Sequence, residues 1–561
     1  MRFCNMDHTP RYLPILLAFC MFTTGASGLV NEYVLATITT YILGNSIEQF
    51  SIVIACMMLM MGVSGFVQSK MSDQNLLQKF IAVEVLMALL GGFAPLAIYS
   101  AYGYLENHFQ FVHYFFVLSV GFLIGFEIPL VMRIIEQNKI NLRVNLTLVY
   151  GMDYVGAFIG ALIWVNYLLK NFPLTEISFI VAGFNFIVAI LTIIYFMTRK
   201  IISRPLIHCV ALLVTAVALI WGFVSNRDIS NLLEQRFYDD PIVYKETTRY
   251  QHLVITHSNI TDDTRLYING NTQFSSLDEE RYHDFLVHPL MAAAPDAKNI
   301  LVLGGGDGLA LRELNKYPSI ESVTLVDLDP EMVKVASTHP RLREINNDAF
   351  RNAKVIIEPA SLDEPGSHSG LFLYEDTATV DDSEYVASLV VYNIDADQFL
   401  RQKPKQQWDA VVIDLPDPSS IELSKLYSKQ FYQMLRLYLT DDAVISMQST
   451  SPYHAKEAYL SIGATMRAAG FNALPYRQNI PSFGDWGYYL AWVDNKTEAE
   501  VKATLSRLEN FEVETSFITP ELLAASFSFG KGELHTDTLC VNTLMQPCLL
   551  THYVDRSWIV E

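Results

Sequence analysis

The sequence predicts two unlike parts: a multi-pass α-helical membrane domain, and an α/β Rossmann-like domain that begins with a small β-rich subdomain. Long apolar runs fill the first part of the chain. Short strand-like segments with an Asn-Gly turn come next, followed by strand–loop–helix units with a glycine-rich loop. We divide the chain into a membrane domain (1–225), a connector (226–245), the β-rich subdomain (246–295), the Rossmann-like domain (296–500) and a C-terminal extension (501–561).

The membrane domain is predicted from seven runs that are each long enough to cross a bilayer as a helix, which takes about 20 apolar residues. In total, 51% of the chain is hydrophobic. An N-terminal signal peptide is rejected because the first run continues past any cleavage site and further spans follow. The runs cover residues 13–43, 48–68, 77–100, 110–135, 145–168, 174–197 and 206–225.

Basic residues lie mainly in the second, fourth and sixth connections between these runs, which places those connections and the N-terminus in the cytoplasm. Seven spans would then put the C-terminal half outside.

Three acids, Glu84, Glu127 and Asp153, lie well inside predicted spans, and Glu32 lies within the first run. A charged side chain at that depth is costly, and a simple anchor has no need of several. Either they are protonated or hydrogen-bonded between helices, or they line a path or a binding site for a cation.

The acidity of the chain lies wholly in its second half. Residues 226–561 carry 28 Lys and Arg against 49 Asp and Glu, whereas residues 1–225 carry 11 against 10. A negative field repels nucleic acid phosphates and attracts cations, so we expect no nucleic acid partner. Cys540 and Cys548 lack a CxxC or His pattern for zinc, and a disulfide between them requires an oxidising compartment.

A nucleotide site is predicted where the strand 299–303 runs into Gly304-Gly305-Gly306-Asp307-Gly308. A helix follows, and a second strand ends in Asp327, 23 residues after the first glycine. Glycines let the backbone approach a ligand, and the acid after the second strand accepts from ribose hydroxyls. This spacing is typical of Rossmann-type folds.

Acids also end or follow the later predicted strands, at Asp395, Asp414 and Asp417. Each alone is typical of a turn or a helix cap. Because ligands bind at the carboxyl ends of strands in open α/β sheets, we expect these three to converge with Asp307 and Asp327 on one crevice. Five acids suit a polycationic substrate. NAD is disfavoured because no basic group near the loop would meet its pyrophosphate.

Several motifs together resemble those of the polyamine aminopropyltransferases (spermidine synthases), in the bacterial form with an N-terminal multi-span domain. The resemblance covers about residues 246–495. The motifs are Tyr250-Gln251, Gln273, Asp278-Glu279-Glu280-Arg281-Tyr282-His283, the glycine loop with Leu311-Arg312-Glu313, and Asp414-Leu415-Pro416-Asp417-Pro418.

The resemblance implies an α/β fold of the S-adenosylmethionine-dependent methyltransferase type. It also implies decarboxylated S-adenosylmethionine as co-substrate, with no permanently bound cofactor and no metal. This donor is made in the cytosol and favours a cytoplasmic C-terminal half, against the loop charges, so the sequence leaves the side open. Asp307 is expected to anchor the aminopropyl ammonium of the donor, Asp327 its ribose and Asp395 its adenine side. Gln251 and His283 are expected to complete the donor site.

The acceptor implied by the family is a diamine such as putrescine, with spermidine and methylthioadenosine as products. Asp414 is expected to be the general base, because an amine attacks only after losing a proton. Tyr282, Asp417 and Gln273 are expected to position the amines. Two departures from the family pattern, Asn269 and Phe483, affect the acceptor side.

Two alternatives stay open at this point: an S-adenosylmethionine-dependent methyltransferase, and a non-catalytic polyamine transporter or sensor. The fold alone does not separate them. We expect a multi-pass protein of the cell membrane, in a bacterial inner membrane, with the lipid bilayer and a small polyamine substrate as its partners. The sequence does not decide whether the chain forms a homo-oligomer, and the acidic stretch 358–386 carries no readable motif.

Overall fold

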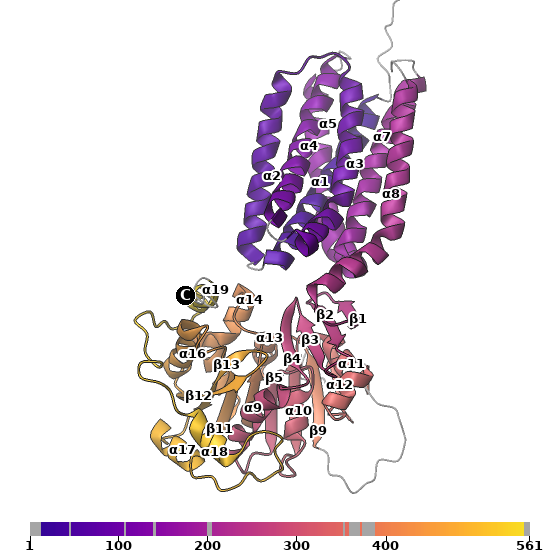
Figure 1. The fold of residues 1–561 in the computed structure, drawn as a ribbon. Helices are drawn as coiled ribbons and strands as arrows, with labels where there is room; N and C mark the ends of the chain where they lie inside the picture. Colours follow the sequence, from indigo (N-terminus) through magenta and orange to yellow (C-terminus); the bar gives the residue numbers. More distant parts are fainter. Residues whose placement is uncertain are drawn as a thin grey trace, which may run out of the picture. The chain divides into compact units, whose positions relative to one another are not determined.

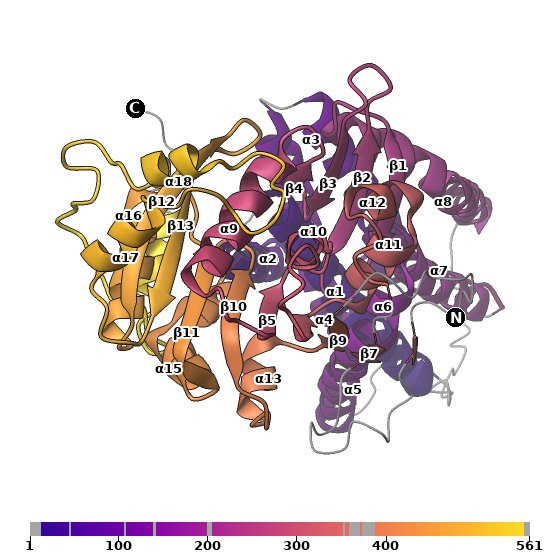
Figure 2. The same cartoon turned by 90° about the horizontal axis from the view of Figure 1, so that it is seen from below.

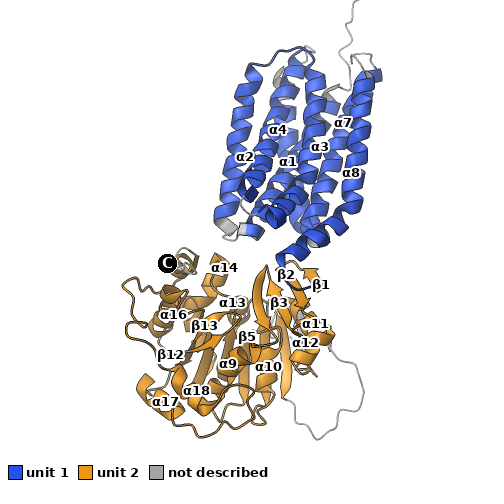
Figure 3. Cartoon of the chain, in the orientation of Figure 1, with its two compact units in different colours: residues 1–241 blue, residues 242–561 orange. Residues whose placement is uncertain are grey.

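The computed structural model describes residues 13–43, 46–105, 108–137, 142–198, 205–351, 354–357, 371–372 and 387–554. The chain divides into two compact units, residues 1–241 and residues 242–561, coloured separately in Figure 3. The acidic stretch 358–386 lies outside the described residues except for its positions 371–372.

The first unit is a bundle of long helices (Figure 1). Among the described residues, seven helices are long and apolar enough to cross a membrane, and they coincide with the seven predicted runs. The helices are α1 (Leu13–Leu43), α2 (Ser46–Ser69), α3 (Leu76–Tyr104), α4 (Phe109–Gln137), α5 (Leu142–Ile163), the π-turn Trp164–Leu168, α6 (Leu169–Asn171), α7 (Leu174–Thr198), α8 (Pro205–Glu234) and the 3₁₀ turn Gln235–Phe237.

Helix α8 is longer than the sequence predicted, because it continues through residues 226–234 of the expected connector. That segment contains no proline or glycine, and the first such residue after it is Pro241. The first strand, β1 (Ile242–Thr247), begins directly after that proline.

The second unit opens with a small antiparallel sheet in the order β1-β2-β3-β4, where β2 is His252–His257, β3 is Thr264–Ile268 and β4 is Asn271–Ser275. Asn269 and Gly270 form the turn between β3 and β4, with φ of +51° and +82°. Positive φ at both positions is the reason that Asn-Gly is favoured in such turns, so the predicted turn is confirmed.

A nine-stranded sheet in the order β12-β13-β11-β10-β5-β6-β9-β7-β8 forms the centre of this unit. The strands β11, β10, β5, β6, β9 and β7 run parallel, and β12, β13 and β8 complete the edges in antiparallel pairs. The strands are β5 (Asn299–Gly304), β6 (Ser322–Asp327), β7 (Lys354–Ile357), β8 (Leu371–Phe372), β9 (Ser388–Asn393), β10 (Trp408–Asp414), β11 (Leu439–Gln448), β12 (Asn472–Ile480) and β13 (Gly484–Trp492).

Helices cover both faces of this sheet (Figure 2). Along β5, Ile300 and Val302 join one hydrophobic core, and Leu301 and Leu303 join the other. This alternation follows from the two-residue period of a strand, and burial on both faces explains the continuous apolar run in the sequence. The helices are α9 (Glu279–Ala293), α10 (Leu309–Leu314), α11 (Pro330–Thr338), α12 (Pro340–Ile345), α13 (Ala396–Arg401), α14 (Ile421–Ser424), the 3₁₀ turn Lys425–Tyr427, α15 (Lys429–Arg436), α16 (Lys456–Ala468), α17 (Glu498–Leu505), α18 (Pro520–Ser526) and α19 (Cys548–Val554).

Candidate active site

The sheet order brings the carboxyl ends of β10, β5, β6 and β9 side by side. Asp414 is the last residue of β10 and pairs in register with Gly304 at the end of β5. Asp327 ends β6, and Asp395 follows β9 by two residues. The predicted convergence of strand-end acids at one sheet edge therefore has its backbone basis in four adjacent parallel strands.

The glycine loop lies directly between two of these acids. A side chain on Gly304 is impossible, since its Cβ would lie 2.0 Å from the backbone oxygen of Asp414, and its φ is +82°. A Cβ on Gly306 would lie 2.6 Å from Oδ2 of Asp327, and the Gly306 amide donates to that oxygen at 3.1 Å. The loop thus needs glycine because the acids approach its backbone so closely.

Asp414, the predicted base, accepts a 2.6 Å hydrogen bond from the Tyr282 hydroxyl. Burial raises the pKa of Asp414 to about 6, and the negative charge of Asp307 adds to the increase. Burial also raises the pKa of Asp307, and the charge of His283 opposes that rise. Two acids and a histidine therefore form one electrostatically linked group around the end of β10.

His283 is held by a residue for which no role was predicted. Its Nδ1 lies 2.9 Å from both the backbone oxygen and Oε2 of Glu279, one helical turn earlier in α9. Burial alone would lower the pKa of His283, but the hydrogen bond and charge of Glu279 raise it to about 9. His283 is thus a cation at neutral pH, next to Asp307 and Asp414.

Glu279 is fixed in turn by Arg312 of α10, whose Nη1 donates to Oε1 at 2.6 Å and whose Nη2 donates to Oε2 at 3.0 Å. Such a two-pronged pair is the strong form of a charge-assisted hydrogen bond. Glu279 and His283 are four residues apart on a helix, a spacing that could have indicated their contact. The contact with Arg312 has no such local signal.

The predicted ribose acid, Asp327, accepts from the backbone amides of Gly306 and, at 2.9 Å, Asp329. Burial raises its pKa to about 7. Asp329, which sequence reasoning missed, accepts a 2.8 Å hydrogen bond from Thr248 and another from Gln251. Gln251 was predicted to contact the donor substrate. Its hydrogen bond to Asp329 places it, next to the small sheet, close to Asp327.

Asp395 has a different environment from the other predicted acids. It caps α13 by accepting from the Gln398 amide at 3.0 Å, and Lys425 Nζ donates to its two oxygens at 3.1 Å and 3.0 Å. The predicted role of Asp395 on the adenine side stays a prediction, since capping and pairing with Lys425 already occupy the carboxylate.

Asp417 lies within a set of neutral hydrogen-bonding groups. Gln448 donates to it at 3.3 Å, and Tyr553 also hydrogen-bonds to it. Burial raises its pKa to about 6, although these hydrogen bonds oppose the increase. Tyr553 belongs to α19, so the predicted C-terminal extension contributes directly to the surroundings of Asp417.

Gln273 is the predicted site residue with the weakest structural link to the others. Its amide nitrogen donates to the backbone oxygen of Asn271 at 3.3 Å. Within the described part of the chain, no hydrogen bond joins it to Asp414, Tyr282 or Asp417. Its proposed acceptor role therefore rests on the motif alone.

Aromatic rings surround Tyr282 beside Asp414. Their centroids lie 6.1 Å from Tyr282 for Phe483, 6.5 Å for Trp486 and 5.7 Å for Tyr488. The sequence singled out Phe483 as a departure on the acceptor side, and it does lie against Tyr282. Trp486 was missed, and its buried indole Nε1 has no hydrogen-bond partner among the described residues. Aromatic faces attract ammonium groups, so this wall suits an amine.

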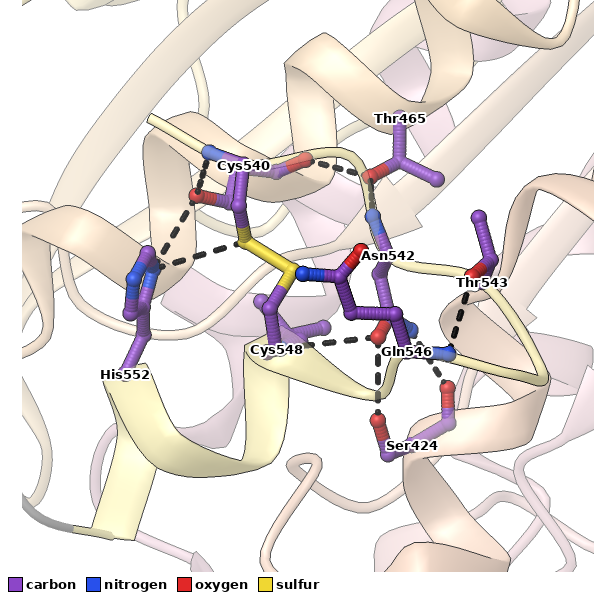
Figure 4. Close-up of a disulfide and its surroundings, with 10 residues drawn as sticks. Ser424, Thr465, Cys540, Asn542, Thr543, Gln546, Cys548 and His552 are labelled. Carbon is purple, nitrogen blue, oxygen red and sulfur yellow. Dashed lines mark hydrogen bonds between the residues drawn. A yellow bond between two sulfur atoms is a disulfide. The ribbon is translucent and has the colours of Figure 1, made fainter. Parts of the chain in front are cut away.

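The C-terminal segment is fastened by a disulfide between Cys540 and Cys548 (Figure 4). Beside it, Asn542 exchanges hydrogen bonds with Ser424, and its amide donates to Thr465 Oγ1 at 2.9 Å. The two cysteines therefore have a structural role. A disulfide between them is the pairing that the sequence made conditional on an oxidising compartment.

A buried group of Asp284, His288 and Glu313 has the spacing of metal ligands. Protein groups already pair with both carboxylates: Arg312 and Lys316 pair with Glu313, and backbone amides donate to Asp284 Oδ2. His288 bridges the two carboxylates at 3.3 Å and 3.0 Å. Since positive charge already lies at this position, the cluster fits an ion-pair network and not a metal.

Comparison with known proteins assigns the chain to a family. Residues 279–358 and 372–503 match the spermine/spermidine synthase domain. Polyamine aminopropyltransferase 1 of Streptomyces coelicolor is 34% identical over 559 residues, covering 98% of this chain and 96% of the relative. This chain belongs to the polyamine aminopropyltransferase family. Polyamine aminopropyltransferase 2 of Aquifex aeolicus is also 34% identical, over 96% of this chain and 98% of its own length.

Among solved structures, the chain is similar to a spermidine synthase from Thermotoga maritima, with 21% identity and a TM-score of 0.40. The match covers 52% of this chain and 87% of that one. The relatives compared above match almost the full length of the chain and so extend over the helical unit as well.

Proposed function

We propose that this protein transfers an aminopropyl group from decarboxylated S-adenosylmethionine to a diamine such as putrescine, giving spermidine and methylthioadenosine. One observation carries the proposal: Asp414 ends the central strand β10, receives a hydrogen bond from Tyr282 and adjoins Asp307 and His283. Family membership over nearly the whole chain supports the same reaction.

In the proposed reaction, the Asp414 carboxylate removes a proton from the attacking ammonium of the acceptor. The amine nitrogen then bonds to the propyl carbon next to sulfur, and the carbon–sulfur bond breaks with its electron pair left on sulfur. The products are a longer amine and the neutral thioether. Because a sulfonium is already a good leaving group, the protein supplies proton removal and alignment.

The donor is proposed to lie along the ends of β5 and β6. Asp307 would face its aminopropyl ammonium, and Asp327 would accept from its ribose hydroxyls, with Gln251 and His283 beside them. Asp395 is proposed on the adenine side, and Tyr282, Asp417 and Gln273 are proposed to hold the acceptor. The aromatic wall with Trp486 would add a face for the methylene chain and ammonium.

The experiment that tests this function uses the purified full-length protein with decarboxylated donor and a panel of diamines. We expect methylthioadenosine to form with at least one diamine and in equal amount to a longer polyamine. Turnover of S-adenosylmethionine with a methylated product would support a methyltransferase instead. Polyamine binding without either product would support a transporter or sensor.

We also propose that the seven long helices place the protein in a bacterial cell membrane as a multi-pass protein. An odd number of spans puts the two ends of the helical unit on opposite sides. The basic residues of the even connections favour a C-terminal unit outside the cytoplasm. The Cys540–Cys548 disulfide adds a second observation for that side, although the source of the donor favours the cytoplasm.

A reporter fused after residue 561 tests the side directly. The loop charges and the disulfide together predict an enzyme reporter that is active outside the cytoplasm. They also predict that thiol reagents label Cys540 and Cys548 only after reduction. A reporter that is active only in the cytoplasm, with both thiols free in cells, would place the C-terminal unit in the cytoplasm, where the donor is made.

A further inference from the structure

A polar seam runs through the interior of the helical unit along one face of α1. Cys20, Thr24, Ser27 and Asn31 recur every three or four positions, so they lie on the same side of that helix. All four are buried. In a bundle proposed to span a membrane, such a face marks a helix contact, and ionisable side chains beside it mark a candidate site.

The residues of this seam face the helices that pack against α1. Cys20 Sγ lies 3.8 Å from Thr192 Oγ1 of α7, and Ser27 hydrogen-bonds to Asn185 of the same helix. The amide of Asn31 lies against α3, since a Cβ on Gly91 would be 3.1 Å from its oxygen. The seam is thus the meeting line of α1 with α3 and α7.

The three predicted intramembrane acids gather around this seam. Thr24 hydrogen-bonds to Glu127 of α4, and a Cβ on Gly25 would lie 2.8 Å from Oδ1 of Asp153 of α5. Glu84 of α3 interacts electrostatically with Glu127, and Glu127 does so with Asp153. The carboxylates therefore form a series across three helices, with Glu127 in the middle.

The central feature is that several polar groups around the seam lack a hydrogen-bond partner. Glu84 is fully buried, and neither of its carboxylate oxygens has a hydrogen-bond partner in the described part of the chain. The Nδ2 atoms of Asn31 and Asn185, 3% and 0% exposed, are also unpaired there. Buried polar groups are normally satisfied, so an unsatisfied set around one seam indicates a missing partner.

No basic side chain that the structure describes in the helical unit provides that partner. Among the described residues of the seven helices, the Lys and Arg side chains that form ion pairs are Arg133 and Arg227, which pair with Asp73 and Glu176. No described ion pair involves Glu84, Glu127 or Asp153. For the Glu84 carboxylate, the partner that fits is therefore a cation from outside the chain.

We propose that the seam and its three acids bind a linear polyamine cation within the helical unit. The proposal rests on the proposed function only for the identity of the cation, which is the class of molecule that the second unit makes or consumes. An extended series of carboxylates between apolar walls matches ammonium groups that are separated by methylene chains. A metal fits less well, because these three carboxylates do not form a group with ligand atoms within 4.8 Å of one another among the described residues.

The test is equilibrium binding of labelled spermidine to the full-length protein in lipid nanodiscs. We expect two equivalents per chain, one in the active site and one in the seam. Glu84→Gln and Glu127→Gln should each lower this to one equivalent while the transferase rate in the same preparation changes less than about twofold. The matched control is Glu136→Gln, an exposed acid near the end of α4, which should keep both equivalents.

Several outcomes separate the possibilities. One equivalent in the wild type, or two in both variants, would overturn the inference whatever the transferase assay shows. If the wild type binds two equivalents but shows no aminopropyl transfer, the proposed function would be overturned and the proposed polyamine site in the seam would stand. Glutamine is nearly isosteric and uncharged, so the thermal unfolding temperature in detergent should not be lower for the Glu84→Gln variant than for the wild type. Collapse of that variant would show that Glu84 is structural and would also overturn the inference.

Discussion

Both units bury carboxylates, but their surroundings differ. In the α/β unit, each of three carboxylates has hydrogen-bond donors. Asp414 accepts from the Tyr282 hydroxyl, Glu279 from His283 and Arg312, and Asp327 from backbone amides. In the helical unit, Glu84 has no partner among the described residues. The donors around Asp414 and Asp327 are the reason that we propose chemistry there, and the lack of donors around Glu84 is the reason that we propose a cation site in the helical unit.

If the strand-end acids do the chemistry, the largest effect follows from replacing Asp414. Asp414→Asn should retain the donor but lower turnover by roughly two to four orders of magnitude, the scale for losing a general base. Turnover comes from methylthioadenosine release and donor affinity from calorimetry. Asp441→Asn, at an exposed position of β11, is the control and should be near normal. Near-normal turnover of Asp414→Asn would remove that residue from the mechanism.

The donor preference tests whether Asp307 faces the aminopropyl end. The carboxylate of S-adenosylmethionine would lie near Asp307, and two like charges about 4 Å apart cost about 4 kcal/mol at an effective dielectric of 20. We expect the decarboxylated donor to bind at least about 100-fold more tightly, which calorimetry measures. Asp307→Asn should reduce the difference in affinity between the decarboxylated donor and S-adenosylmethionine. Equal binding of both donors to the wild-type protein would favour methyl transfer.

The pH profile tests the same group by its charge. The pKa of Asp414 is raised to about 6, and only the carboxylate form accepts a proton. Activity at saturating donor should therefore fall as pH drops below about 6, approaching tenfold per pH unit. Since the hydroxyl of Tyr282 lowers the pKa of Asp414, Tyr282→Phe should move this limb to higher pH. A profile with an unchanged acidic limb in both Tyr282→Phe and Asp414→Asn would assign the limb to another group.

The smallest expected effect concerns the C-terminal clasp, by which we mean the Cys540–Cys548 disulfide and α19. Cys540→Ser should loosen α19 and weaken the hydrogen bond from Tyr553 to Asp417, which is worth about 1 kcal/mol. The KM for the diamine should rise a few-fold, with the KM for the donor unchanged. Tyr553→Phe should reproduce the change without touching the disulfide. An unaltered diamine KM in both variants would separate the clasp from the acceptor site.

Local patterns were enough to predict the seven helices, the glycine loop, the Asn-Gly turn and the acids at strand ends. Contacts between distant segments were not predictable, because periodicity carries no information on strand order. Tyr282 reaches Asp414 across 132 residues, and Tyr553 reaches Asp417 from the last described helix. The length of α8 was missed because a polar segment was taken as a connector.

The central claim is that the propyl carbons move while the methyl group stays on sulfur. The most direct measurement gives the full-length protein a decarboxylated donor that carries one isotope in the S-methyl group and another in the aminopropyl chain. We predict that the aminopropyl label appears in a longer polyamine and that the methyl label stays in methylthioadenosine, with both absent for Asp414→Asn at matched times. Appearance of the methyl label in the amine product would contradict the account.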